Sequence, residues 1–179
     1  MWILKPGEFS NRGNGITVCH FLDEINLRLK SKERSSDGAL RTFIIQKYIE
    51  KPLLYKSRKF DIRHFMLVTC FNGVFKAYWF PEGYVRTSSS LFTLKRGANQ
   101  YVHLTNDAIQ ERGDEYGKYE KGNKVSYEKF QQYLDKTLRK KVYKNVFFES
   151  ILPQMKELAI DSVKATYLSL DEKRREHNF

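Results

Sequence analysis

A strand pattern over residues 59–71 constrains the fold of this chain most strongly. Residues two apart in a strand share one face and successive residues rise about 3.3 Å, so Lys59, Asp61 and Arg63 form a row of alternating charges. The opposite face is mostly apolar, and the charged face also becomes apolar further along. The pair Asn72-Gly73 then favours a two-residue hairpin turn. The segment therefore predicts an antiparallel hairpin whose first strand begins with a charged row.

Two interpretations of the charged row stay open at this point. Charges at the start of a strand with two apolar faces can line the edge of a cleft. They can equally form a solvated ladder of cross-strand pairs, each worth a few tenths of a kcal/mol.

The composition narrows the class of partner. The chain has 179 residues, and 32 Lys and Arg against 21 Asp and Glu give a net charge of +11, which attracts polyanions without selecting one. No nucleic-acid-binding motif, membrane-spanning run or basic amphipathic anchor is present, so neither nucleic acid nor a membrane is the expected partner. Cys19 and Cys70 have neither metal-ligand spacing nor a disulfide pattern, which favours a reducing compartment.

The order of predicted elements indicates an α+β chain. Strands precede a change of pattern near Pro52, an antiparallel hairpin system follows it, and helices dominate from residue 126. Pro52 is the expected boundary, dividing the chain into 1–51 and 52–179. The expected strands are 2–4, 16–19, 43–49, 59–71, 74–80, 85–88 and 101–104, and the expected helices begin near 21, 126 and 151.

Four segments could hold a ligand. Lys5 precedes the glycines of residues 7–15, and such a loop can approach a phosphate, although it fits neither common nucleotide-binding spacing and is more often a turn. Residues 46–49 could offer backbone groups to a purine, or simply belong to a core strand. Arg86 is followed by four hydroxyl residues, and an arginine fork suits carboxylate or phosphate oxygens. Thr105 and Asn106 could orient a ligand or cap a helix.

The order of these segments resembles the tubulin–tyrosine ligase family. The similarity covers essentially all of residues 1–179. The motifs that carry it are Trp2-Ile3-Leu4-Lys5-Pro6, Gly13-Asn14-Gly15-Ile16, the run from Gln46 to Leu54, Arg58-Lys59-Phe60-Asp61-Ile62-Arg63, the run from Glu82 to Ser89, and His103-Leu104-Thr105-Asn106 through Gln110. Residues 86–89 and 116–120 lean toward the tyrosine ligase itself.

The resemblance implies an ATP-grasp fold and an ATP-dependent ligase that joins a free amino acid to the acidic tail of tubulin through an acyl phosphate. Tyrosine is the favoured amino acid, with glutamate and glycine as alternatives. A cytoplasmic, cytoskeletal location follows, with a cilium or flagellum as a further expectation. By analogy Lys5 holds phosphate, and adenine is bound by Gln46, Lys47, Tyr48 and Ile49. Lys59 and Asp61 contact the nucleotide. Arg63 and Arg86 are catalytic, and Thr105 and Asn106 lie at the same cleft.

The family's Mg²⁺-binding carboxylates have no counterparts in this sequence. They are expected beyond Phe179, and an N-terminal domain is expected before Met1. The ATP-grasp fold is thus expected to be incomplete and the chain as given to be inactive. The alternative function is a degenerate module that binds acidic tubulin tails; a basic RNA-binding domain is a remote third.

Overall fold

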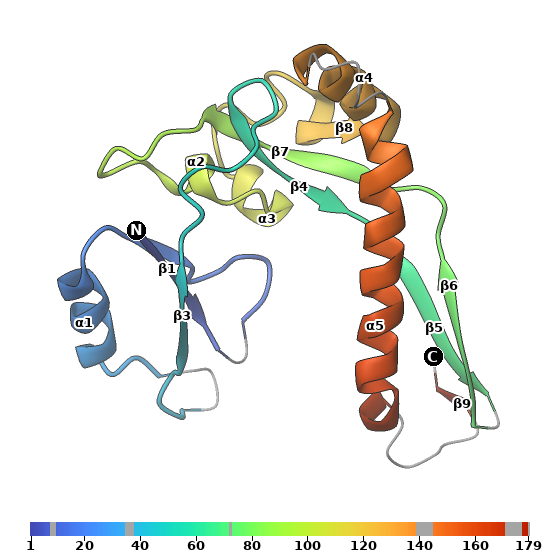
Figure 1. The fold of residues 1–179 in the computed structure, drawn as a ribbon. Coiled ribbons are helices and arrows are strands. Elements are labelled where there is room, and N and C mark those ends of the chain that lie inside the picture. Colours follow the sequence, from blue (N-terminus) through green and yellow to red (C-terminus); the bar gives the residue numbers. More distant parts are fainter. Residues whose placement is uncertain (8–9, 35–37, 72, 139–144, 171–176, 179) are drawn as a thin grey trace. The chain divides into compact units, whose positions relative to one another are not determined.

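The structure is a computed structural model that describes residues 1–7, 10–34, 38–71, 73–138, 145–170 and 177–178 (Figure 1). The contacts divide the chain into two units. The first contains Met1–Asp61 and Arg86–Lys124, and the second contains Ile62–Val85 and Val125–Phe179. This division does not fall at Pro52, and the expected assignment of 1–51 and 52–179 to ATP-grasp subdomains stays a prediction.

The first unit begins with a sheet of order β2-β1-β3. Its strands are β1 (Trp2–Pro6), β2 (Thr17–Cys19) and β3 (Phe43–Lys47), and both neighbours of β1 are antiparallel to it. Side chains alternate across β1 because a strand has a period of two. Leu4 packs with Cys19 and with Ile25 of helix α1 (Leu22–Lys30). Ile3 packs on the other face, with Tyr48. Lys5 therefore points to the same face as Ile3.

A second sheet has the order β4-β7-β8 and contains β4 (Arg58–Arg63), β7 (Tyr84–Leu91) and β8 (Lys124–Ser126). The predicted strand 59–71 is wrong as a single strand, because β4 ends at Arg63 and β5 (Met66–Phe71) begins after it. The cause is a change of partner, since β5 pairs with β6 (Val74–Trp79). His64 lies at the break, stacked on Trp79 with ring centroids 3.4 Å apart.

The hairpin predicted around residues 72–73 is confirmed. Strands β5 and β6 are antiparallel, with Phe71 opposite Val74, so two residues connect them. Gly73 has a φ of 74°, which glycine adopts without steric cost. Asn72 lies outside the described residues. Strand β9 (His177–Asn178) pairs with the other edge of β5.

The predicted strand at 101–104 is wrong, because residues 101–103 belong to helix α2 (Gln100–His103). The side chain of Asn99 accepts a hydrogen bond from the backbone N–H of Tyr101 at 3.0 Å, which caps the helix. Helix α3 (Asp107–Gln110) follows, and the 3₁₀ turn η1 (Lys121–Asn123) leads into β8.

The C-terminal helices belong to the second unit. Helix α4 (Tyr127–Thr137) begins at Ser126, whose side chain accepts a hydrogen bond from the N–H of Lys129. Phe130 and Leu134 are buried, and Phe147 of the π-helical turn η2 (Phe147–Ile151) packs edge-on against Phe130. These contacts confirm the helix expected to begin near residue 126 and show that one of its faces is buried.

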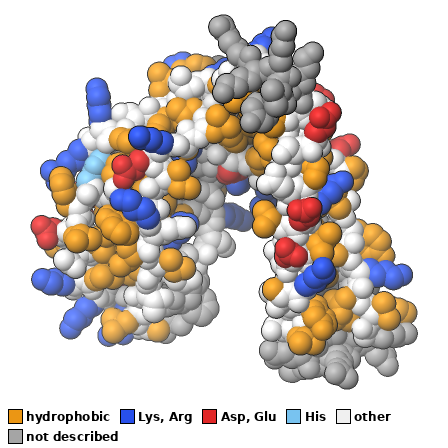
Figure 2. Space-filling view, in the orientation of Figure 1, with side chains coloured by type: hydrophobic (Ala, Val, Ile, Leu, Met, Phe, Trp, Pro, Cys, Tyr) orange, Lys and Arg blue, Asp and Glu red, His pale blue; other side chains and the backbone are white. Residues whose placement is uncertain are grey.

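Helix α5 (Leu152–Leu170) is more exposed than its sequence predicts. None of its residues is fully buried, and Figure 2 shows hydrophobic side chains interspersed with charged ones over it. Only a narrow stripe is half-buried (Leu152, Met155, Ala159, Val163). Tyr167, expected on the apolar face, is 44% exposed, although its ring meets that of Phe75. No helix in the described part of the chain is long and apolar enough to cross a bilayer.

Candidate functional site

Lys5 and Gln46 meet on one face of the first sheet. The Nζ of Lys5 donates a hydrogen bond to Oε1 of Gln46 at 2.7 Å. The pairing register explains this contact, because Ile3 lies opposite Gln46 and Lys5 points to the same face as Ile3. Two of the predicted site residues are therefore neighbours although they are 41 positions apart in sequence.

Lys47 and Ile49, which also belong to the predicted adenine segment, point away from this face. Lys47 lies opposite Trp2, and its Nζ is 5.1 Å from the centre of the Trp2 ring. Ile49 is 70% exposed. Lys47 is one position from Gln46 in β3, so its side chain lies on the opposite face of the strand. The backbone groups of Lys47 and Ile49 can still take part, since β3 has a single sheet neighbour among the described residues.

Lys59 projects from β4 to the same region. Its Nζ donates hydrogen bonds to the hydroxyl of Tyr48 at 3.2 Å and to the carbonyl of His103 at 3.1 Å. Burial lowers the pKa of the Lys59 amine, and the charge of Lys5 lowers it further. The two ammonium groups therefore repel each other, and an anion between them would relieve that repulsion.

Asp61 holds the guanidinium of Arg86 in a two-point contact. The Nε and Nη2 of Arg86 donate to the two carboxylate oxygens of Asp61 at 2.8 and 2.9 Å. The hydroxyl of Thr105 donates to the same carboxylate. This geometry fixes the plane of the fork. Asp61, Arg86 and Thr105 thus form one cluster, and their roles toward a ligand stay predictions.

Asn106 occupies the N-cap position of α3, but its side chain makes no capping bond to the helix. The glycine loop lies against it instead. A Cβ built on Gly13 would come 2.8 Å from Oδ1 of Asn106, and the φ of Gly13 is +86°. Glycine is required there because any side chain would clash and strain the backbone.

Arg12, which the sequence analysis did not single out, lies in the glycine loop between two pockets. One, of about 170 Å³, is lined by Lys5 and the loop, and the other, of about 280 Å³, is lined by Arg12, Arg86 and Asn106. Arg12 has a φ of 57°, unusual for a residue other than glycine. Its position directly before Gly13-Asn14-Gly15 was the only sequence signal.

Arg63 belongs to the second unit. Its side chain is exposed and its guanidinium lies 5.0 Å from the ring of Phe65. The structure therefore does not join it to the cluster of Asp61 and Arg86, and its catalytic role stays a prediction.

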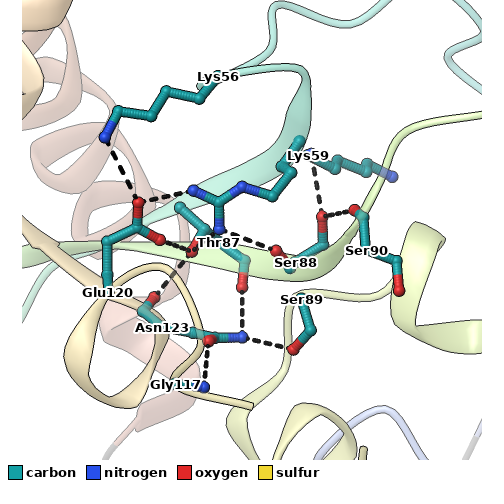
Figure 3. A network of polar contacts seen from close by, with 10 residues as sticks. Lys56, Lys59, Thr87, Ser88, Ser89, Ser90, Gly117, Glu120 and Asn123 are labelled. Atoms are coloured by element: carbon teal, nitrogen blue, oxygen red, sulfur yellow. Dashed lines mark hydrogen bonds and ion pairs between the residues drawn. The ribbon is translucent and has the colours of Figure 1, made fainter. Parts of the chain in front are cut away.

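Three of the four hydroxyl residues after Arg86 are not open to a ligand. Thr87, Ser88 and Ser89 are buried, and Figure 3 shows them within a polar network. At the centre of that network Arg58, 1% exposed, donates to Glu120 at 2.6 Å, to the hydroxyl of Thr87 and to the carbonyl of Ser88. The expectation that these hydroxyls pair with Arg86 around a ligand is thus wrong, because they hold the strand in place.

Gln110 links that strand to the segment carrying His103 and Thr105. Its Oε1 accepts from the backbone N–H of Ser89 at 2.8 Å, and its Nε2 donates to the carbonyls of Tyr101 and Leu104. Gln110 is 1% exposed. The buried amide therefore fixes the position of Thr105 relative to β7.

No three His, Cys, Asp or Glu side chains gather as a metal site would require within the described residues. Asp61 is already paired with Arg86 and Thr105. The magnesium ion implied by the sequence resemblance stays a prediction.

Comparison with known proteins finds similarity to proteins named as tubulin-modifying enzymes. The profile of the tubulin-tyrosine ligase family matches residues 1–177. Tubulin glycylase 3D of Tetrahymena thermophila is 38% identical over 172 residues, which cover 94% of this chain and 15% of the relative. Tubulin monoglycylase TTLL3 of Mus musculus is 34% identical over 93% of this chain and 17% of its own length. The probable tubulin polyglutamylase TTLL9 of Bos taurus is 36% identical over 58% of the chain and 22% of its own length.

The chain therefore spans less than a fifth of the length of the two glycylases. Their names indicate glycine transfer, so the expected preference for tyrosine finds no support among these relatives.

Proposed function

The chain belongs to the tubulin–tyrosine ligase family, and from this premise we propose that it carries nucleotide- and carboxylate-binding side chains of an ATP-dependent ligase. The ligase would join an amino acid to the acidic tail of tubulin. The observation that carries the proposal is the gathering of Lys5, Lys59 and the Asp61–Arg86 pair within one unit.

The cationic groups suit the triphosphate of ATP. Lys5 lies in β1 and Lys59 in β4, and the charge of Lys5 lowers the pKa of Lys59. A polyanion bound beside them would favour the charged state of the Lys59 amine. The loop at Gly13 permits close approach of the backbone to phosphate oxygens. The outer edge of β3 supplies backbone groups for the purine.

The carboxylate chemistry would take place near Arg86. A glutamate carboxylate of the tail attacks the terminal phosphorus of ATP, and the bond to ADP breaks, which leaves an acyl phosphate. The amine of the incoming amino acid then attacks the acyl carbon, and inorganic phosphate leaves. Arg86, oriented by Asp61, would stabilise negative charge in both steps. Arg12, which lines the same pocket, would add a second cation.

The acceptor and the amino acid follow from charge and from the relatives. A net charge of +11 favours encounter with an acidic tail. Two of the relatives described above are glycylases and one is a probable polyglutamylase, so glycine is the first candidate and glutamate the second. Action on tubulin would place the protein with cytoplasmic microtubules; a ciliary location stays a prediction.

Nucleotide binding gives the first test. Replacing Lys59 by methionine should weaken ATP binding about tenfold to a hundredfold, since a hydrogen bond from a charged donor is worth about 1.5–3 kcal/mol. Isothermal titration of the chain with ATP in the presence of MgCl₂ measures the change. Lys76→Met, on the exposed face of β6 in the other unit, is the matched control and should bind ATP as the parent does.

Equal affinity of the Lys59→Met variant and the parent would refute the assigned role of Lys59. Absence of ATP binding by the parent, with salt-sensitive binding of an acidic tubulin-tail peptide, would instead favour the binding module.

A further inference from the structure

Tyr48, Lys59 and His103 come from three separate segments and form one hydrogen-bonded group. Tyr48 follows β3, Lys59 lies in β4, and His103 ends α2. The Tyr48 hydroxyl lies 2.9 Å from Nδ1 of His103 and 3.2 Å from Nζ of Lys59. The backbone carbonyl of His103 accepts from the same Nζ at 3.1 Å. The ammonium of Lys59 is therefore held from two sides.

The donor and acceptor roles in this group follow from chemistry. A lysine ammonium can only donate, so the oxygen of Tyr48 must accept from Lys59. The single hydroxyl proton of Tyr48 is then free to donate to His103. We assign Nδ1 of His103 as its acceptor, which requires a neutral imidazole with its proton on Nε2. Burial supports these roles, because it raises the pKa of Tyr48 to about 12 and keeps the phenol protonated.

The surroundings of His103 also favour its neutral form. The residue is 4% exposed, and its ring meets those of Tyr48 and Phe92 edge-on. Burial lowers the pKa of His103, and the charges of Lys59 and His20 lower it further. Glu24, Arg28 and Arg96 also line the pocket that His103 faces.

Protonation of His103 would disrupt the group in two ways. Nδ1 would become a donor and could no longer accept from Tyr48, so the Tyr48 hydroxyl proton would lose this acceptor while both His103 and Lys59 pointed donors at the phenolic oxygen. A second positive charge would also appear beside the Lys59 ammonium. We propose that Tyr48 and His103 are positioning residues that hold the Lys59 ammonium for an anionic ligand, and that they do so only while His103 is neutral. This inference rests on the proposed function, in which the ligand is the triphosphate of ATP.

The direction with pH is set by the lowered pKa of His103. A histidine in the unfolded chain takes up its proton near pH 6.5, and the folded His103 does so only at lower pH. The arrangement is therefore intact above pH 6.5 and is lost as the pH falls through the lowered pKa. ATP affinity should be flat above pH 7 and should fall on the acid side.

The test compares two substitutions at His103 with Tyr48→Phe in the whole chain. His103→Asn places an amide oxygen near the position of Nδ1 and cannot be protonated, whereas His103→Leu removes the acceptor. We expect Tyr48→Phe and His103→Leu to weaken ATP binding about fivefold to tenfold at pH 7.5, the size of one net hydrogen bond. We expect His103→Asn to keep most of the affinity and to lose the acid-side fall. If His103 has only a packing role, the Asn variant will retain the fall with pH, and the proposal is then wrong.

A second readout does not depend on ATP. In ¹⁵N-labelled chain at pH 7.5, the imidazole signals of His103 should show a proton on Nε2 and a hydrogen-bonded, unprotonated Nδ1, and Tyr48→Phe should shift the Nδ1 signal. A proton found on Nδ1 would overturn the proposed roles. Failure of ATP binding with the expected imidazole signals would instead count against the nucleotide function alone.

Discussion

In a ligase that contains this chain, Arg86→Gln is expected to lower kcat/KM for amino-acid transfer by about 10²- to 10³-fold, the loss typical of removing one preorganised donor to developing negative charge. The reason lies in the contact with Asp61, which binds Nε and Nη2 at 2.8 and 2.9 Å and so fixes the fork before any ligand arrives. Glutamine has neither the charge nor the fork. The measurement is steady-state transfer of radiolabelled glycine to a tubulin-tail peptide.

Arg86→Lys separates charge from geometry. Lysine keeps the positive charge but cannot make the two-point contact with Asp61, so it should recover only a minor part of the rate. Arg34→Gln is the control, because Arg34 lies exposed and bonds to the carbonyl of Gly38. Full activity of Arg86→Gln would refute the assignment of Arg86.

Glu120→Ala is expected to lower the free energy of unfolding by about 3–5 kcal/mol, since it leaves a buried charge without its partner. Arg58 is 1% exposed and its Nη2 lies 2.6 Å from Glu120. The contact between its guanidinium and the ring of Tyr119 cannot replace a carboxylate. Urea denaturation of the variant and the parent measures the change.

The exposed pair of Glu115 and Lys118 supplies the control. Glu115→Ala should change the stability by less than about 0.5 kcal/mol, because exposed ion pairs contribute little. Replacing both buried partners, as Arg58→Met with Glu120→Leu, should recover a large part of the loss. A loss no larger for Glu120→Ala than for Glu115→Ala would contradict the described network.

Local sequence patterns predicted much of the fold, because these elements are determined by residues close to one another in the sequence. The apolar run at residues 2–4 correctly indicates a strand, and the Asn72-Gly73 pair correctly indicates the hairpin of β5 and β6. The break after Arg63 could not be predicted, since it depends on which strand each half pairs with. The Asn99 cap similarly overrode the strand-like composition of residues 101–104.

The candidate site was predicted in part through its order along the chain. Lys5 and Lys59 were identified, but their mutual repulsion appears only when the segments are folded. The burial of Thr87 to Ser89 could not be foreseen, because hydroxyl residues suit a ligand and a buried network equally. Arg12 was missed since a loop sequence does not show which pockets it separates.

Transfer of labelled glycine, glutamate and tyrosine to a synthetic acidic tubulin tail by a ligase that contains this chain, with and without ATP, tests the central claim most directly. The account predicts incorporation that requires ATP, releases one ADP and one phosphate for each amino acid joined, and favours glycine or glutamate over tyrosine. Mass spectrometry of the tail should place the new amide on a glutamate side chain. Incorporation that does not need ATP, or ATP-dependent incorporation of none of the three amino acids, would contradict it.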